Sequence, residues 1–167
     1  SINGRIGLLI SNRAESGAVR FAAEKNIQTK ILSKDIISSK KKYINFLKYH
    51  LKNYETDLII LAGYLKIIPK EIISIYKHKI LNIHPSLLPK YGGKGFYGIK
   101  VHEQVINAKE KHSGATVHFV DEIYDNGPII AQHRVHVSND ETAESLSRKV
   151  LEIEHKLFPY VVKKICE

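Results

Sequence analysis

Apolar runs alternate with segments of helical periodicity along most of the chain. Buried strands are predicted by the apolar runs at residues 5–10, 29–32, 57–62 and 80–83. Helices are predicted between these runs, at residues 16–25, 40–54, 69–76 and 97–108, where apolar residues recur every three or four positions. Strands that alternate with helices are typical of an α/β protein, in which a mainly parallel sheet carries helices on both faces.

The alternation ends after Ala108. Two further strands are expected at residues 115–120 and 129–135, and a short loop with Gly127 and Pro128 separates them, so at least one edge strand is expected to be antiparallel. A long closing helix is expected to begin near Asp140 and to kink or stop at Pro159. Because no repeat, low-complexity segment or linker divides the sequence, a single domain over residues 1–167 is expected.

Composition excludes several classes of protein. The 167 residues are 43% apolar and 26% charged, which is typical of a soluble globular protein. No apolar run approaches the roughly 20 residues of a membrane span. No signal peptide is recognisable at the amino end, so a cytoplasmic location and no membrane partner are expected. The single cysteine, Cys166, excludes a disulfide framework and a thiolate metal cluster.

The formal net charge of +9 is compatible with two kinds of partner. A basic surface attracts nucleic acid, and it also attracts small phosphorylated or anionic substrates. The lysines are scattered, and residues 40–42 form their only run. Because no aromatic interleaving or binding motif accompanies that run, a solvated surface is the preferred interpretation, and no nucleic-acid partner is expected.

An amide and an imidazole lie two residues apart at the end of the strand predicted at residues 80–83. Side chains two residues apart project from the same face of a strand, and Pro85 follows Asn82 and His84 directly. In α/β proteins, the carboxyl ends of the strands border the crevice that binds ligands. Asp125 adds a carboxylate in the loop that contains Gly127 and Pro128. An amide, an imidazole and a carboxylate are the groups that acyl transfer needs.

Six short motifs extend the pattern over essentially the whole chain. In order, they are Ser11-Asn12-Arg13, Leu61-Ala62-Gly63-Tyr64, the segment from Leu81 to Tyr91, the segment from Gly114 to Val120, Asp125-Asn126-Gly127-Pro128, and Glu154-His155. Together they resemble the motifs of the folate-dependent glycinamide ribonucleotide (phosphoribosylglycinamide) formyltransferases. The resemblance implies a Rossmann-like formyltransferase sheet. It also implies transfer of a formyl group from the co-substrate 10-formyltetrahydrofolate to the primary amine of glycinamide ribonucleotide in purine synthesis, by a monomer or homodimer without a metal.

The same resemblance implies roles for individual residues. The catalytic residues would be Asn82, His84 and Asp125. Contacts to the folate would come from Leu65, Lys66, Ile68, Asn82, Asp121, Glu122, Ile123, Tyr124 and Asp125. The ribonucleotide would contact Pro85 and Glu154. Thr116 and His118 are either close to the folate or structural, and the sequence leaves both interpretations open.

Formyl transfer to an amine makes three demands on such a site, because an oxyanion forms, the amine loses a proton and the leaving nitrogen gains one. The Asn82 amide can donate to the oxyanion. His84 can donate to the same oxygen or relay a proton. Asp125 can orient the imidazole and favour its protonated form, or it can accept the amine proton itself. Which of His84 and Asp125 moves the proton is left open.

The chain departs from the family pattern at its beginning. Family members normally start with a further strand and a Gly-rich turn that binds the ribonucleotide phosphate at a helix amino terminus, whereas here Ser1 comes just before what would be the second strand. The first strand and the phosphate loop are therefore expected to be absent from this polypeptide. Folate binding would be retained and ribonucleotide binding weakened.

Three alternative functions stay open. Methionyl-tRNA formyltransferase and formyltetrahydrofolate hydrolase share the catalytic trio on a related domain. Against the tRNA enzyme, Lys90-Tyr91-Gly92-Gly93 occupies the place where that enzyme normally has an Arg-Gly pair. The third alternative is a folate-binding fragment without activity.

Overall fold

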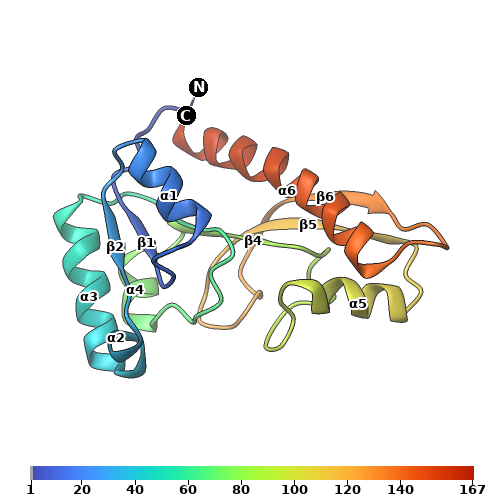
Figure 1. Ribbon diagram of the computed structural model, residues 1–167, viewed down its shortest axis with the longest axis horizontal. Coiled ribbons are helices and arrows are strands. Elements are labelled where there is room, and N and C mark those ends of the chain that lie inside the picture. Colours follow the sequence, from blue (N-terminus) through green and yellow to red (C-terminus); the bar gives the residue numbers. More distant parts are fainter. Residues whose placement is uncertain (1) are drawn as a thin grey trace. The chain divides into compact units, whose positions relative to one another are not determined.

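Six strands and six helices follow one another in residues 2–167, the part of the chain that the structure describes. The structure is a computed structural model, and its elements are shown in Figure 1. They fall into two units, one of Gly4–Asp57 and one of Leu58–Glu167 with Ile2 and Asn3. The predicted α/β class is confirmed, and a single domain over residues 1–167 stays a prediction. Within residues 2–167, every helix is too short or too polar to cross a membrane.

The unit Gly4–Asp57 contains a two-stranded parallel sheet. Strand β1 (Leu9–Ser11) pairs with β2 (Thr29–Ile31), and helix α1 (Gly17–Glu24) connects them. Helices α2 (Lys34–Ser38) and α3 (Lys40–Asn53) follow. The predicted helix–strand order is therefore found in this unit, with one additional helix.

Two features of this unit differ from the expectation based on sequence. The strand predicted at residues 5–10 begins only at Leu9, because Leu9–Ser11 is the stretch that finds partners in the three-residue strand β2. The additional helix α2 has five residues, which are too few to show a helical repeat of apolar positions.

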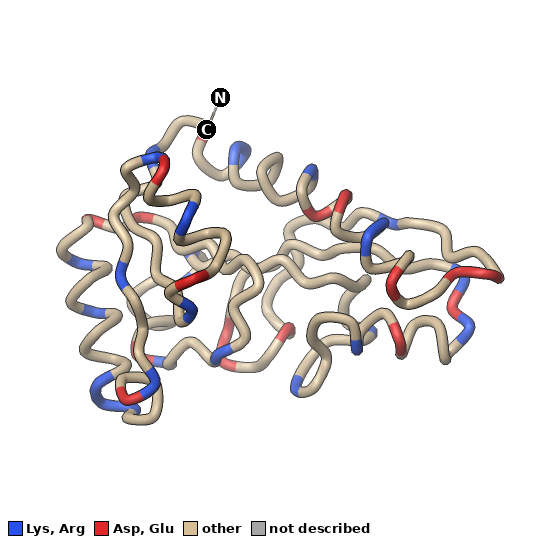
Figure 2. The backbone as a smooth tube through the Cα atoms, in the orientation of Figure 1, with Lys and Arg blue, Asp and Glu red and all other residues tan. Residues whose placement is uncertain are grey.

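Basic residues occur along both units and are interspersed with acidic ones (Figure 2). The lysine run at residues 40–42 begins α3, where Lys42 Nζ lies 3.3 Å from a carboxylate oxygen of Asp35. Both side chains are more than half exposed. A partly paired, exposed lysine run is the arrangement expected of a solvated helix surface.

A four-stranded sheet is the framework of the unit Leu58–Glu167. Its strands lie in the order β3 (Ile59–Leu61), β4 (Ile80–His84), β5 (His112–Phe119) and β6 (Ile129–His136), and α4 (Lys70–Ile75) connects β3 to β4. β3 and β4 are parallel, whereas β5 is antiparallel to both of its neighbours, β4 and β6. The antiparallel edge pairing predicted from sequence is confirmed at β6, although the strand that runs in the opposite direction is β5, inside the sheet.

The register between β4 and β5 sorts their side chains onto two faces. Asn82 is paired with His118, and His84 is paired with Thr116. Paired residues project from the same face of a sheet, so these four polar side chains share one face. Ile83 and its partner Val117 lie on the opposite, apolar face.

Helices α5 (Ile99–Asn107) and α6 (Ala143–Cys166) pack against the apolar face. One buried cluster joins Leu81 and Val117 of the sheet to Phe158, Val161 and Val162 of α6. A second cluster combines Ala115 of β5 with Val105, Val137, Leu146 and Val150. Burial of one such side chain stabilises the fold by about 1.5–3 kcal/mol. The helices thus hold the sheet from one side and leave the polar face free for other groups.

The closing helix does not stop at Pro159, so that half of the expectation is wrong, and a kink at this proline stays a prediction. α6 begins after the capping residue Thr142, near the predicted position, and continues through Pro159 to Cys166. Proline has no N–H group, so one carbonyl in the preceding turn lacks its helical donor. Phe158 and Val161 on either side of Pro159 are buried in the sheet cluster, and this packing outweighs the lost hydrogen bond.

Candidate active site

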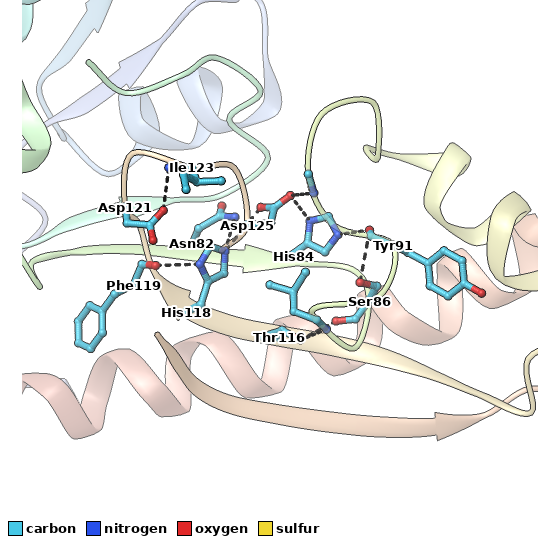
Figure 3. Close-up of polar contacts among 12 residues, drawn as sticks. Asn82, His84, Ser86, Tyr91, Thr116, His118, Phe119, Asp121, Ile123 and Asp125 are labelled. Atoms are coloured by element: carbon cyan, nitrogen blue, oxygen red, sulfur yellow. Dashed lines mark hydrogen bonds and ion pairs between the residues drawn. The ribbon is translucent and has the colours of Figure 1, made fainter. Parts of the chain in front are cut away.

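The polar face of β4 and β5 meets the loop between β5 and β6 (Figure 3). Asn82 and His84 lie at the carboxyl end of β4, His118 lies on β5, and Asp125 lies in the loop. The structure brings these four side chains into one cluster. The predicted amide, imidazole and carboxylate are therefore neighbours, and a second imidazole joins them.

Asp125 lies between the two imidazole rings. Its Oδ2 is 3.5 Å from His84 Nδ1, and its Oδ1 is 3.6 Å from His118 Nε2. The backbone N–H of Gly93 donates to Oδ2 at 2.9 Å. The Asp125 side chain is only 10% exposed, and both imidazoles are more deeply buried. Charges in such surroundings interact more strongly than charges at a surface.

Two backbone carbonyls determine which nitrogen of each ring carries a hydrogen. His84 Nε2 lies 2.7 Å from Tyr91 O, and His118 Nδ1 lies 2.8 Å from Phe119 O. A carbonyl oxygen can only accept, so both of these nitrogens must donate. In the neutral rings, His84 Nδ1 and His118 Nε2 then carry lone pairs, and these are the nitrogens that face Asp125. The two distances to Asp125, which are longer than a normal hydrogen bond, agree with this assignment.

The orientation of the Asn82 amide follows from the tautomer of His118. Asn82 Nδ2 lies 3.1 Å from His118 Nε2, which accepts a hydrogen bond when the ring is neutral. An amide nitrogen has two hydrogens, so one remains for a ligand. His118 therefore contacts Asn82 and lies beside Asp125, and its nearness to a folate stays a prediction.

Gly127 allows the loop that carries Asp125 to lie close to β5. A Cβ atom at this position would lie 1.9 Å from Phe119 O, the carbonyl that accepts from His118. Any side chain at residue 127 would therefore displace either the loop or the carbonyl that holds the imidazole.

Burial has the largest effect on the pKa of both His84 and Asp125. It lowers the pKa of His84, and it outweighs the Asp125 carboxylate and the Tyr91 carbonyl, which act in the opposite direction. Burial raises the pKa of Asp125, but the neighbouring imidazoles of His118 and His84 and the Gly93 N–H together lower that pKa below its ordinary value. Asp125 thus favours a protonated His84, as expected, but the net direction is downward because desolvation dominates.

The loops expected to contact the folate meet at one point. Tyr124 Oη donates to Leu65 O at 3.5 Å, so the segment after β3 touches the loop that carries Asp125. Leu65, Lys66, Glu122, Ile123 and Tyr124 are exposed and Asp121 is half-buried, whereas Ile68 is only 7% exposed. Ile67, which the sequence analysis did not select, is 59% exposed. In this segment after β3, Ile67 therefore offers accessible apolar surface and Ile68 does not.

The two residues expected to contact the ribonucleotide have different positions. Pro85 directly follows His84 and is half-buried beside the cluster. Glu154 lies on α6, the helix that packs against the opposite, apolar face of the sheet. Burial raises the pKa of Glu154 to about 7. The structure thus brings Pro85, but not Glu154, to the Asp125 cluster.

Several groups that hold the cluster escape prediction from sequence. Tyr91, Phe119 and Gly93 act through backbone atoms, which every residue type except proline supplies in full, so no residue pattern indicates them. Thr116 lies behind the cluster, where its hydroxyl contacts the turn after β4 rather than Asp125. Among residues 2–167, no group of three or more His, Cys, Asp or Glu side chains is placed to hold a metal ion.

The family model for formyl transferases matches residues 1–162. The chain belongs to the formyl transferase family. It is 44% identical over 167 residues to the chloroplastic phosphoribosylglycinamide formyltransferase of Vigna unguiculata, and the match covers all of this chain and 54% of that protein. This membership confirms the resemblance seen in the sequence motifs.

Solved structures of formyl transferases share the fold. Phosphoribosylglycinamide formyltransferase from Bacillus halodurans superposes with a TM-score of 0.90 at 34% identity, covering 98% of this chain and 82% of that chain. The enzyme of the same name from Anaplasma phagocytophilum has a TM-score of 0.87 at 35% identity, covering 98% and 76%.

The chain spans little more than half the length of the plant relatives that it matches, 54% for Vigna unguiculata and 58% for Arabidopsis thaliana. Family membership and fold follow from these matches. The donor and acceptor that this chain uses do not follow from them alone.

Proposed function

We propose that this chain transfers a formyl group from 10-formyltetrahydrofolate to the primary amine of glycinamide ribonucleotide, with residues 1–167 acting as one formyltransferase domain. Membership of the formyl transferase family supports the reaction class, and relatives named phosphoribosylglycinamide formyltransferase support the acceptor. The observation that carries the proposal is the Asp125 cluster, in which an amide and two imidazoles surround one buried carboxylate.

In the proposed reaction, Asn82 stabilises the negative charge that develops on the formyl oxygen. One hydrogen of its Nδ2 is held by His118, which aims the amide and leaves the second hydrogen for the oxyanion. A donor fixed before the reaction needs no reorganisation when charge develops. Loss of one such donor typically reduces turnover by roughly 100- to 1000-fold.

Asp125 and His84 move the proton. When the amine attacks the formyl carbon, its nitrogen becomes positively charged and must release a proton, while the folate nitrogen N10 must gain one as the carbon–nitrogen bond breaks. The ionised Asp125 accepts the amine proton, and the bare Nδ1 of His84 shares it across the 3.5 Å separation. Delivery of that proton to N10 completes the transfer with no net change in the protonation of the protein.

The exposed rim beside the cluster suits a folate. Leu65, Ile67, Ile123 and Tyr124 offer apolar surface for a flat ring system, and they lie where the two loops meet. Lys66 supplies a cation that can pair with the folate carboxylate as a point charge. We also propose that Pro85 and Glu154 contact the ribonucleotide.

The test is the rate of formyl-donor consumption by the purified protein with three acceptors: glycinamide ribonucleotide, water alone and methionyl-tRNA. The proposal expects consumption that depends on the ribonucleotide and yields formylated ribonucleotide by mass spectrometry. Equal consumption without the ribonucleotide would identify a hydrolase. Saturable folate binding without consumption in any arm would identify a binding fragment, and either outcome overturns the proposal.

A further inference from the structure

Thr116 anchors the turn after β4 to the sheet. Its side chain is fully buried, and its hydroxyl donates to Ser86 O at 2.6 Å. The same oxygen accepts from Leu88 N at 3.1 Å and from Gln132 Nε2 at 2.9 Å. A hydroxyl has one hydrogen and two lone pairs, so every hydrogen-bonding position of Thr116 is occupied within the protein. Its role is therefore to hold the turn rather than to bind a ligand.

Gln132 on β6 makes a second connection to the same turn. Its Nε2 donates to Leu88 O at 2.9 Å as well as to the Thr116 hydroxyl, so both amide hydrogens are used. Residue 132 is paired with residue 116 in the register, which puts both side chains on the polar face of the sheet. A carboxylate of the same shape at this position would accept hydrogen bonds but could not donate them.

Ser86 connects the turn held by Thr116 and Gln132 to the carbonyl that contacts His84. Ser86 is fully buried, and its hydroxyl donates to Lys90 O at 2.7 Å, with Tyr91 O a further 3.5 Å contact. Tyr91 O is the atom that accepts from His84 Nε2. Figure 3 shows Ser86 and Tyr91 in the turn after His84, with Thr116 on β5 below the turn. Gln132 and Thr116 therefore hold one end of the turn, Ser86 holds its Lys90–Tyr91 end, and the Tyr91 carbonyl in that turn accepts from the imidazole of His84.

We propose that Thr116 and Gln132 are positioning residues that set the tautomer of His84. They hold the turn so that the Tyr91 carbonyl stays on Nε2, and Nδ1 is then left bare toward Asp125. A carboxylate is a stronger acceptor than a carbonyl, so once the turn is released the hydrogen moves to Nδ1 and the ring donates to Asp125. His84 Nδ1 then already carries a hydrogen and can no longer share the amine proton. This catalytic consequence rests on the proposed function, whereas the tautomer is a property of the protein alone.

Long-range proton–nitrogen NMR of the imidazoles tests the tautomer directly, with the His84 signals assigned by their loss in His84→Gln. We expect the parent and Thr116→Ser, which keeps the hydroxyl, to show the Nε2–H tautomer. Thr116→Val and Gln132→Glu should both show a shift toward Nδ1–H. His133→Gln, at an exposed position on the same strand, should match the parent. A Nδ1–H ring in the parent, or an unchanged tautomer in Gln132→Glu, overturns the proposal. If Thr116→Val does not fold, Gln132→Glu alone decides the test, because a substitution at the exposed residue 132 should leave the protein folded.

Steady-state kinetics test the catalytic consequence. We expect Gln132→Glu and Thr116→Val to lower kcat by roughly tenfold to a hundredfold, as small displacements of reacting groups do. KM for the folate should change by less than about threefold. A purely structural role would lower thermal stability without changing the tautomer or kcat, and that result would refute the positioning role. If the parent itself transfers no formyl group, the proposed function fails, and the NMR result still decides the tautomer.

Discussion

At the scale of single residues, the Asp125 cluster is arranged to hold one additional proton. Each imidazole uses its N–H on a backbone carbonyl, and His118 Nε2 accepts from Asn82, so the free lone pair of His84 Nδ1 faces the carboxylate. Without a proton, these acceptors cannot bond to one another. One proton converts the contact between Asp125 and His84 into a hydrogen bond, and burial prevents water from supplying it freely. A proton that a substrate nitrogen delivers would therefore be stabilised by the hydrogen bond that it forms between Asp125 and His84.

Asp125→Asn should abolish most of the formyl transfer while folding and folate binding persist. The amide keeps the shape and can donate to the bare Nδ1 of His84, but it cannot accept the amine proton. Loss of a general base typically lowers turnover by about 100- to 10,000-fold. Steady-state rates and a folate titration measure the two effects, with Asp140→Asn in an exposed loop as the control. Near-normal turnover in Asp125→Asn would remove this residue from the mechanism.

The sequence predicted the side chains of the site better than the groups that orient them. Asn82 and His84 were predicted from their spacing on one strand, and Asp125 from its loop and motif. Their orientation depends on the Tyr91 and Phe119 carbonyls, which are independent of residue type and therefore leave no sequence signal. The tautomers follow only from three-dimensional contacts.

At the scale of elements, the register of β4 and β5 creates the site. The alternation along β5 is visible in the sequence, where Ala115 and Val117 are apolar and Thr116 and His118 are polar. Which residue of β4 is opposite His118 depends on the tertiary structure, and the sequence contains no local signal for it. Strand ends depend on pairing in the same way: β1 begins at Leu9 rather than Arg5, because only Leu9–Ser11 pairs with β2.

Substitution of Pro159 tests how strongly packing overrides local propensity in α6. Pro159→Ala restores a backbone donor inside the helix, and residue 159 is exposed, so little packing is lost. We expect the free energy of unfolding to rise by about 1–2 kcal/mol, because part of the gain is offset by the more flexible unfolded chain. Denaturant unfolding measures the change. Pro159→Gly, which restores the donor but not the helix propensity, should gain about 1 kcal/mol less than alanine. Equal stability of the parent and Pro159→Ala would show that the helix is already bent to accommodate the ring.

At the scale of the whole molecule, buried ionisable groups make stability depend on pH in opposite directions. His84 and His102 have lowered pKa values, whereas Glu154 has a raised one, and burial is the largest cause for all three. Because the folded state disfavours protonated His84 and His102, these histidines make the protein less stable as the pH falls. Because it disfavours ionised Glu154, this glutamate makes the protein less stable as the pH rises. The stability of the protein between pH 4 and 7 is therefore the sum of two opposing slopes, which single substitutions can separate.

His102 should account for part of the loss of stability in acid. It is 2% exposed, its Nδ1 has no hydrogen-bond partner within residues 2–167, and its pKa is lowered to about 4 by burial and then by His84. The unfolded chain protonates near pH 6.5, so the folded state binds fewer protons between about pH 6.5 and 4 and loses stability as the pH falls through that window. His102→Gln cannot protonate, so its stability relative to the parent should rise between pH 7 and 4.5. Urea unfolding at both values, with His133→Gln as the exposed control, measures this. Parallel losses in parent and variant would contradict it.

Glu154 should produce the opposite slope. Its folded pKa of about 7 lies above the ordinary glutamate value, so the folded state holds the proton through the window that the unfolded chain has already left. Stability is then full below about pH 4.5 and falls as the pH rises toward 7. Glu154→Gln keeps the shape and removes the charge, so its advantage over the parent should grow across this window, by on the order of 2 kcal/mol, and stay constant above it. Denaturant unfolding at pH 5 and pH 8 measures the change, with Glu152→Gln, exposed on the same helix, as the matched control. An advantage that does not grow with pH would mean that water reaches the Glu154 carboxylate, and the burial of this side chain by α6 and its neighbours would then have no part in the pH dependence of folding.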